Sequence, residues 1–311
     1  MENKISVVIT SYNRYEYLTQ AIHSVVMQDY SNKEIIVVDD CSDDLNYDEF
    51  KMRDDIIYIR NEANSGASMS RKNGYRVATG EYIIFMDDDD YYTNPDFLKK
   101  AMNGFLNNTD ISFVSGNVNV YAQQSEQVLP ANKLPFYGNV DREEYLKGFQ
   151  TKYIKPYSTF STVFSMKVID KIIEMPMFND SSIYLGALLY GKPYFLEDII
   201  GNYRVHKSNM TKALNVEFIL QNLKQKKDIK DAMLSQVSFD LEKWFYQQVK
   251  LTVDYYLRET RPQLKSAVAV LKWGLQNMKK NRLHFFLDWL YDLVYSYRAT
   301  RKCREENKYE A

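Results

Sequence analysis

The chain has 311 residues, of which 45% are hydrophobic and 26% are charged, and its formal net charge is −1. These values are typical of a globular protein and argue against a general attraction to nucleic acid, so no nucleic-acid partner is expected. Two cysteines make no disulfide framework, and neither a signal peptide nor an apolar run of membrane-spanning length is found, which predicts a cytoplasmic protein, soluble or peripherally bound.

The first 120 residues alternate predicted strands and helices. Apolar runs predict strands, and amphipathic spacing predicts the helices between them. This alternation is typical of βαβ units in an α/β fold with a mostly parallel sheet. The strands are expected at residues 5–10, 34–40, 56–60 and 82–86, and the helices at 15–28 and 68–78.

Further along the chain, a strand is expected at residues 111–121, followed by an irregular stretch at 123–157 that is rich in proline and glycine. Such a stretch is typical of a long functional loop. Strand character returns at 158–165 and 194–206. After His206 the spacing becomes helical with few breakers, apart from Pro262. A boundary is therefore expected near residue 212, with a helical region at 213–311 for oligomerisation, packing or membrane association.

Four consecutive aspartates, Asp87 to Asp90, follow the buried strand "YIIFM". Ligands of open α/β sheets bind outside the carboxyl ends of the strands, which is where this acidic run lies. Clustered carboxylates repel one another unless a cation lies among them, and oxygen ligands suit Mg²⁺ or Mn²⁺. The alternative is a solvated acidic turn that leads into the helix after Pro95.

Two more strand ends carry polar side chains that are expected in the same crevice. Thr10, Tyr12 and Arg14 follow the first strand, and Asp39 and Asp40 follow the second. An aromatic ring for a base, a carboxylate for its N–H edge and a metal site for a diphosphate are the parts of a nucleotide-diphosphate pocket. Each of these features alone is weak evidence for such a pocket. Together they are stronger evidence, because all three are expected at one edge of one sheet.

The sequence resembles the inverting family 2 glycosyltransferases, whose catalytic domain has the GT-A fold. The resemblance covers roughly residues 4–212 and rests on "SVVITSYNR", "EIIVVDDCSDD", "NSGASMSRKNG", "ATGEYIIFMDDDDYYTNPDFL" and "YGKPYFLEDIIGNYRVHKSNMT". It implies a catalytic domain at 1–212, with a nucleotide-sugar half at about 1–120 and an acceptor half at about 121–212.

The resemblance also implies roles for individual residues. Asp89 is the implied ligand of the divalent metal, and His206 is implied to reach the metal or the diphosphate, although it could instead be a structural histidine. The implied nucleotide-sugar contacts are Thr10, Tyr12, Arg14, Asp40, Arg71, Asp87, Asp88 and Arg204.

Asp180 is the implied catalytic base, because it lies eleven residues before Gly191-Lys192. The family commonly has a glutamate before this aspartate, whereas this chain has Asn179. The alternative is that Asp180 is simply the N-cap of a helix.

The function expected from these residues is metal-dependent, inverting transfer of a sugar from a UDP-sugar to a hydroxyl of a glycan or glycolipid, in bacterial surface-polysaccharide synthesis. A sugar nucleotidyltransferase is one alternative, but "TSYNRYEY" lacks the glycine-rich phosphate loop expected after its first strand. A non-catalytic nucleotide-sugar-binding protein is the other, and it would be expected to lose Asp89 or Asp180.

The segment 279–304 lies outside the resemblance. Phe286, Leu290, Leu293 and Tyr297 have helical spacing and predict one apolar face. Basic residues flank it on both sides, namely Lys279, Lys280 and Arg282, then Arg298, Arg301, Lys302 and Arg304. The segment is expected either to pack on the catalytic domain or a second subunit, or to lie on an anionic membrane.

Overall fold

A computed structural model of the chain describes residues 2–106, 108, 110–206 and 215–306, with side chains described up to Ser296. The chain divides into two compact units, Met1–His206 and Lys207–Ala311. The boundary expected near residue 212 falls in 207–214, outside the described residues.

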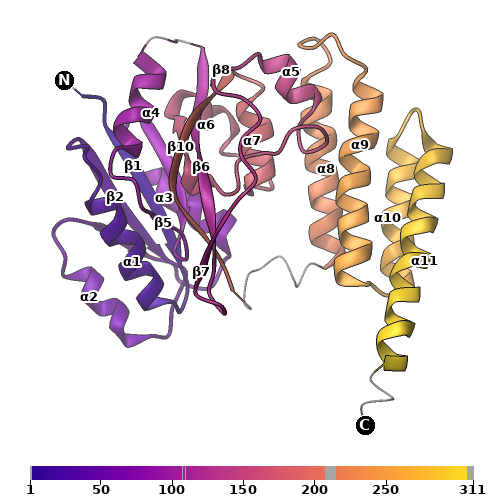
Figure 1. Cartoon of the computed structure of the whole chain (residues 1–311), viewed down its shortest axis with the longest axis horizontal. Helices are drawn as coiled ribbons and strands as arrows, with labels where there is room; N and C mark the ends of the chain where they lie inside the picture. The colour runs from indigo at the N-terminus through magenta and orange to yellow at the C-terminus, as the bar shows by residue number, and fades with distance from the viewer. Residues whose placement is uncertain (1, 107, 109, 207–214, 307–311) are drawn as a thin grey trace. The chain divides into compact units, whose positions relative to one another are not determined.

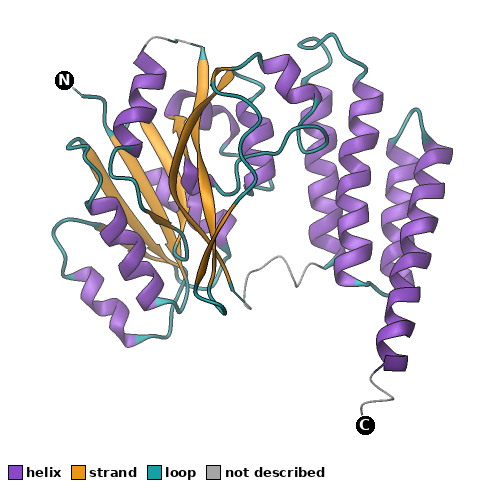
Figure 2. Ribbon diagram, in the orientation of Figure 1, coloured by secondary structure: helices purple, strands orange, loops and turns teal. Residues whose placement is uncertain are grey.

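The amino-terminal unit is built on one sheet, coloured orange in Figure 2. Its first half is parallel, in the order β3-β2-β1-β4, as the alternation of strands and helices predicts. β1 and β4 are buried almost throughout, which explains their continuous apolar sequences. The strands are β1 (Ile5–Ser11), β2 (Lys33–Asp39), β3 (Ile57–Arg60) and β4 (Tyr82–Asp87).

Beyond β4 the sheet becomes mixed. β9 (Thr162–Ser165) runs antiparallel to both β4 and β6 (Ile111–Ala122), and β10 (Lys192–Val205) then pairs with β6 in parallel. The two-residue strand β5 (Tyr91–Tyr92) follows the acidic run and pairs antiparallel with β10. The α/β class is confirmed, and the antiparallel pairings lie in the half of the sheet where the alternating pattern is lost.

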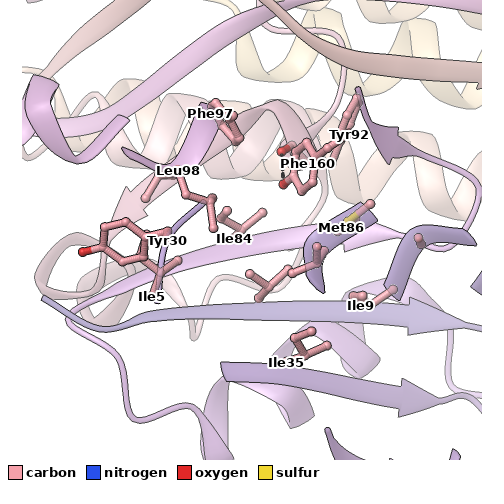
Figure 3. Packing of buried hydrophobic residues seen from close by; sticks show 14 of the residues in the cluster. Ile5, Ile9, Tyr30, Ile35, Ile84, Met86, Tyr92, Phe97, Leu98 and Phe160 are labelled. Carbon is pink, nitrogen blue, oxygen red and sulfur yellow. Dashed lines mark hydrogen bonds between the residues drawn. The ribbon is translucent and has the colours of Figure 1, made fainter. Parts of the chain in front are cut away.

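Helices cover both faces of the sheet (Figure 1). On one face, α1 (Tyr15–Val26) and α4 (Phe97–Leu106) pack on Ile5, Ile9 and Ile84 in a single apolar core (Figure 3). On the other face, α3 (Ala67–Val77) approaches β1 closely, because a Cβ at Gly74 would lie 2.2 Å from Cγ1 of Val8.

Several predicted bounds differ from the structure. The first helix ends at Val26 rather than 28. The stretch 123–157 is not one irregular loop, because it contains β7 (Gln127–Pro130), β8 (Gly138–Asn139) and α5 (Arg142–Lys147). β7 pairs with β6, and β8 pairs with β10, so both strands depend on distant partners. The strand expected at 158–165 begins with a 3-10 turn, Thr159–Ser161.

The carboxy-terminal unit is helical, as expected. Its helices are α8 (Val216–Ala232), α9 (Leu241–Tyr255), α10 (Leu264–Asn277) and α11 (Arg282–Glu306), with a π-helical turn at Tyr256–Thr260. The expected interruption occurs at Pro262, where Arg261 adopts a left-handed conformation with φ of 46°. None of the described helices has the length and hydropathy needed to cross a bilayer.

Candidate active site

The ends of β1, β2 and β4 lie side by side. In the register of the parallel sheet Thr10 is opposite Asp87, and Ser11 is opposite Asp39. The Thr10 hydroxyl donates to Asp87 Oδ1 over 3.3 Å, and the Ser11 hydroxyl donates to Asp88 Oδ2 over 2.7 Å. The strand ends that were expected to lie together are therefore adjacent.

Arg71 joins the acidic run to Asp180. Its Nη2 lies 2.9 and 3.1 Å from the two carboxylate oxygens of Asp87, and its Nη1 lies 3.3 Å from Asp180 Oδ1. Burial disfavours the charged guanidinium, but Asp87 and Asp180 hold the pKa of Arg71 above its usual value. Burial raises the pKa of Asp87, and Arg71 opposes that rise. Two carboxylates separated by 93 positions in the chain are thus held on one buried cation.

Arg14 makes the second bridge of the site. Its Nη1 lies 3.1 Å from both Asp88 Oδ1 and Asp89 Oδ2. The same oxygen of Asp89 lies 2.8 Å from Nε2 of His206, which is also buried. Burial raises the pKa of Asp88 to about 7, although Arg14 opposes the rise. The positive charge of Arg14 therefore partly neutralises the acidic run, as a bound metal ion would.

Asp89 and His206 provide a carboxylate oxygen and an imidazole nitrogen at one point. Among the residues that the structure describes, no group of three or more His, Cys, Asp or Glu side chains is arranged to hold a metal ion. Mg²⁺ and related ions commonly take one or two protein ligands and complete their shell with substrate phosphates and water. Two protein donors fit an ion of that kind, which a diphosphate would help to hold.

Arg204 is buried, and its side chain is surrounded by aromatic rings. Its guanidinium stacks over Tyr17, Tyr121 and Tyr91, at 4.5, 5.1 and 5.3 Å from the ring centroids. Its Nε donates to the backbone oxygen of Asp89 over 3.0 Å, and its backbone N–H donates to Asp90 Oδ1 over 3.2 Å. These contacts fix the end of the acidic run, which is a positioning role.

Asp40 and Tyr12 lie outside this network. Asp40 accepts hydrogen bonds from the N–H groups of Ser65 and Gly66, over 2.9 and 2.7 Å, and another from Asn61. Burial alone would raise the pKa of Asp40, but these hydrogen bonds hold it below its usual value. Asp40 thus shapes the loop that opens α3. Tyr12 is 41% exposed at the end of β1, where its ring is accessible to a ligand.

Asp180 begins α7 (Asp180–Ala187) but does not cap it. The N-cap is Asn179, whose side chain accepts a hydrogen bond from the Ser182 N–H over 3.0 Å. The interpretation of Asp180 as the N-cap is therefore wrong, and its carboxylate is directed to Arg71 and Lys155. Because Asn179 caps the helix, the glutamate common at this position in the family is not needed for that purpose.

Lys155 was missed by the sequence analysis. Its Nζ lies 3.9 Å from Asp180 Oδ2 and donates to the backbone oxygens of Pro156 and Tyr157. Burial lowers its pKa. No motif marks this lysine, and it belongs to the stretch that was expected to be a functional loop.

A cavity of about 310 Å³ lies beside Lys155. Lys155 itself lines it, and so does Gln150, whose side-chain oxygen accepts a hydrogen bond from the Ser181 hydroxyl over 3.3 Å. The cavity wall thus contacts the first two residues of α7. The lining consists of Asn132 and residues 150–157, with the rings of Tyr153 and Tyr157 among them.

The glycosyl transferase family 2 profile matches residues 6–173, more than half of the chain. The chain belongs to this family. It is 32% identical over 199 residues to a putative colanic acid biosynthesis glycosyl transferase, WcaA, of Escherichia coli K12, covering 62% of this chain and 70% of that protein. It is 36% identical over 110 residues to an uncharacterized glycosyltransferase of Haemophilus influenzae, covering 35% of this chain and 37% of the relative.

The GT-A fold of this glycosyltransferase is shared with the crystal structure of residues 1–349 of Staphylococcus aureus TarS in complex with UDP-GlcNAc. The TM-score is 0.67 at 17% identity, and the match covers 98% of this chain and 92% of that one. It therefore extends over the helical unit as well as the sheet.

Proposed function

We propose that this glycosyltransferase is an inverting, metal-dependent hexosyltransferase that moves a sugar from a UDP-sugar to a hydroxyl of a glycan or lipid-linked glycan. The observation that carries the proposal is the Arg71 bridge, which holds Asp180 beside Asp87. A base for the acceptor is thereby fixed next to the acidic run at the nucleotide end of the sheet. The UDP-GlcNAc complex of TarS and the name of the colanic acid relative support the donor and acceptor classes.

Asp180 is proposed as the general base. The acceptor oxygen attacks the anomeric carbon while its proton passes to the Asp180 carboxylate, and the bond from that carbon to the UDP oxygen breaks. One such displacement inverts the anomeric centre. A base in this position contributes about 10²–10⁴-fold to the rate. Nη1 of Arg71 and Nζ of Lys155 lie 3.3 and 3.9 Å from the two oxygens of this carboxylate and hold it in place.

The nucleotide is proposed to bind at the strand ends. The ring of Tyr12 is 41% exposed and is proposed to stack on uracil. Thr10, Asp40 and Arg71 are proposed as further contacts of the nucleotide. Asp87 and Asp88 are proposed on the ribose side, and Arg14 near the phosphates. Arg204 is proposed to act indirectly, by holding the backbone of Asp89.

Asp89 and His206 are proposed to hold Mn²⁺ or Mg²⁺. Such an ion would neutralise the negative charge that develops on the leaving diphosphate. Arg14 shares the Asp89 oxygen that the ion would use, so its side chain is expected to turn from Asp89 toward the phosphates when donor binds.

The acceptor is proposed to enter through the cavity beside Lys155. Its tyrosine rings and amide side chains suit a saccharide, which presents both apolar ring faces and hydroxyl groups. The sugar that is transferred depends on which UDP-sugar binds at the strand ends. The linkage depends on which acceptor hydroxyl the cavity beside Lys155 presents.

The test measures UDP release from a panel of UDP-sugars, with GDP- and dTDP-sugars as controls, in Mn²⁺, in Mg²⁺ and in EDTA. We expect turnover with at least one UDP-sugar, and we expect that turnover to be lost in EDTA and in the Asp89→Asn variant. In calorimetry, Mn²⁺ should no longer strengthen UDP binding by this variant. Proton NMR of the product gives the anomeric configuration. Equal turnover in EDTA and Mn²⁺ would refute metal dependence, and turnover of only GDP- or dTDP-sugars would refute the donor class.

A further inference from the structure

Helix α11 has apolar side chains on two opposite faces. One face is buried within the helical unit, where Trp289 Nε1 donates to the backbone oxygen of Ala267 over 3.0 Å and Phe285 packs against Gly274. The other face is exposed and consists of Leu283, Phe286, Leu287, Leu290, Tyr291, Val294 and Tyr295, each between 38% and 69% exposed. A helix that is apolar all round normally has both faces covered.

The exposed residues form one continuous arc. At about 100° per residue they span roughly half of the helix circumference, and from 283 to 295 the axis rises roughly 18 Å. The single apolar face predicted from the sequence is therefore partly wrong. Phe286 and Leu290 belong to the exposed arc, but Leu293 is buried within the unit, and the side chain of Tyr297 lies outside the described residues.

None of the seven residues of the arc is ionisable at neutral pH, although His284 is exposed beside them, and the acids of this stretch are directed elsewhere. Asp292 is buried and pairs with Arg258, and Asp288 accepts a hydrogen bond from the Tyr246 hydroxyl. Basic residues lie at both ends, namely Lys279, Lys280 and Arg282 before the arc and, in the sequence, Arg298, Arg301, Lys302 and Arg304 after it.

The charge pattern decides between the candidate occupants. Pairing with a second copy of α11, whether parallel or antiparallel, would place basic ends beside basic ends and would be opposed by repulsion. An anionic lipid surface instead attracts both ends while it buries the arc between them. Tyr291 and Tyr295 lie at the edge of the arc, where tyrosines of interfacial helices meet the headgroups.

We propose that the exposed arc of α11 is a docking surface for an anionic membrane, on which the helix lies in the plane of the interface. The structural match to a glycosyltransferase fold neither requires nor predicts this surface, so the inference goes beyond the proposed function.

The test uses the full chain and vesicles of phosphatidylglycerol mixed with phosphatidylcholine, with vesicles of phosphatidylcholine alone for comparison. The double variant Leu287→Glu/Leu290→Glu places two carboxylates in the arc. The matched control, Leu234→Glu/Leu264→Glu, introduces the same charges at positions of the same unit that are 65% and 56% exposed. All four leucines are exposed, so both variants should keep the melting temperature of the parent.

We expect co-sedimentation of the parent and the control with anionic vesicles, and at least tenfold weaker binding of the arc variant. Lys279→Gln/Lys280→Gln should weaken binding to anionic vesicles roughly fivefold for each lysine removed. High salt should also weaken the binding of the parent. Failure of the parent to bind anionic vesicles, or equal binding by the arc variant and the control, would overturn the proposal. A self-association seen by light scattering and lost only in the arc variant, without vesicle binding, would assign the face to a second copy.

Discussion

Asp180 owes its environment to two cations from distant parts of the chain. Arg71 comes from α3 and Lys155 from the stretch before η2 (Thr159–Ser161), and both lie within ion-pairing distance of its carboxylate. Substitution of Asp180 by asparagine preserves the size of the side chain, but it replaces one of the two acceptor oxygens with an NH2 group and removes the ability to accept a proton.

We expect Asp180→Asn to lower turnover by about 10²-fold or more while UDP affinity stays within a factor of about two. Steady-state kinetics and calorimetry with UDP measure the two effects. Asp198→Asn, a partly exposed aspartate paired with Lys100, is the control and should retain parent turnover. Near-parent turnover in Asp180→Asn would show that another group is the base.

Arg71 is the second residue whose substitution tests the site, because it bridges Asp87 and Asp180. Arg71→Met would leave Asp87 and Asp180 without their shared cation, and because both carboxylates are partly exposed the cost should be about 1–3 kcal/mol. Arg71→Lys keeps the charge but cannot span both carboxylates with a planar fork. We therefore expect chemical denaturation to rank stability as parent, then lysine, then methionine. Equal stability of the parent and the lysine variant would contradict the bridging role.

The sequence could locate the acidic run and the strand ends, because both follow from local patterns. A buried apolar run ends at Asp87, and the parallel register then places Thr10 opposite it. Arg71 and Asp180 could each be identified only through the resemblance, without their contact, and Lys155 could not be found at all. Both contacts depend on how the second half of the chain folds back, which no local spacing encodes.

At the scale of elements, the two-residue strand β5 positions the acidic run. β5 begins one residue after Asp90 and is held by β10, in which Gly201 pairs with Tyr92. A Cβ at Gly201 would lie 2.4 Å from the backbone oxygen of Tyr91 and 3.1 Å from Cα of Tyr92. Two residues carry too little pattern to predict a strand, so β5 is visible only in the folded chain. β9 lies within a predicted strand, and only its antiparallel direction could not be read from the sequence.

We expect Gly201→Ala to lower the free energy of unfolding by about 1–3 kcal/mol, because backbone atoms must move to admit the methyl group. UDP binding should weaken as well, since β5 is continuous with Asp89 and Asp90. Gly138→Ala is the control, because no atom lies within 4 Å of its added Cβ and only its φ of 74° is strained. If Gly201→Ala unfolds at the same denaturant concentration as the parent, the close approach does not constrain β5.

At the scale of the whole molecule, the two units can be followed separately. All three tryptophans, Trp244, Trp273 and Trp289, belong to the helical unit, so tryptophan fluorescence reports its unfolding alone. That unit contains a carboxylate pair between α9 and α11. Burial, and then a hydrogen bond with Asp292, raise the pKa of Asp254 to about 7 from an ordinary value of 3.8.

The folded helical unit therefore binds more protons than the unfolded chain between about pH 4 and pH 7, so its stability should fall as pH rises through that window. We expect a loss on the order of 2 kcal/mol, measured by urea unfolding with fluorescence detection between pH 4.5 and 8. Asp254→Asn cannot ionise and still offers a donor to Asp292, so its stability should change less with pH and exceed that of the parent at pH 8. Asp231→Asn is the matched control, because Asp231 pairs with Lys227 at the same i,i+4 spacing as Asp254 with Lys250 but on the surface. The stability of Asp231→Asn should follow the pH dependence of the parent. If the stability of the parent instead rises between pH 5 and 8, and that of Asp254→Asn rises in parallel, the raised pKa of Asp254 is refuted.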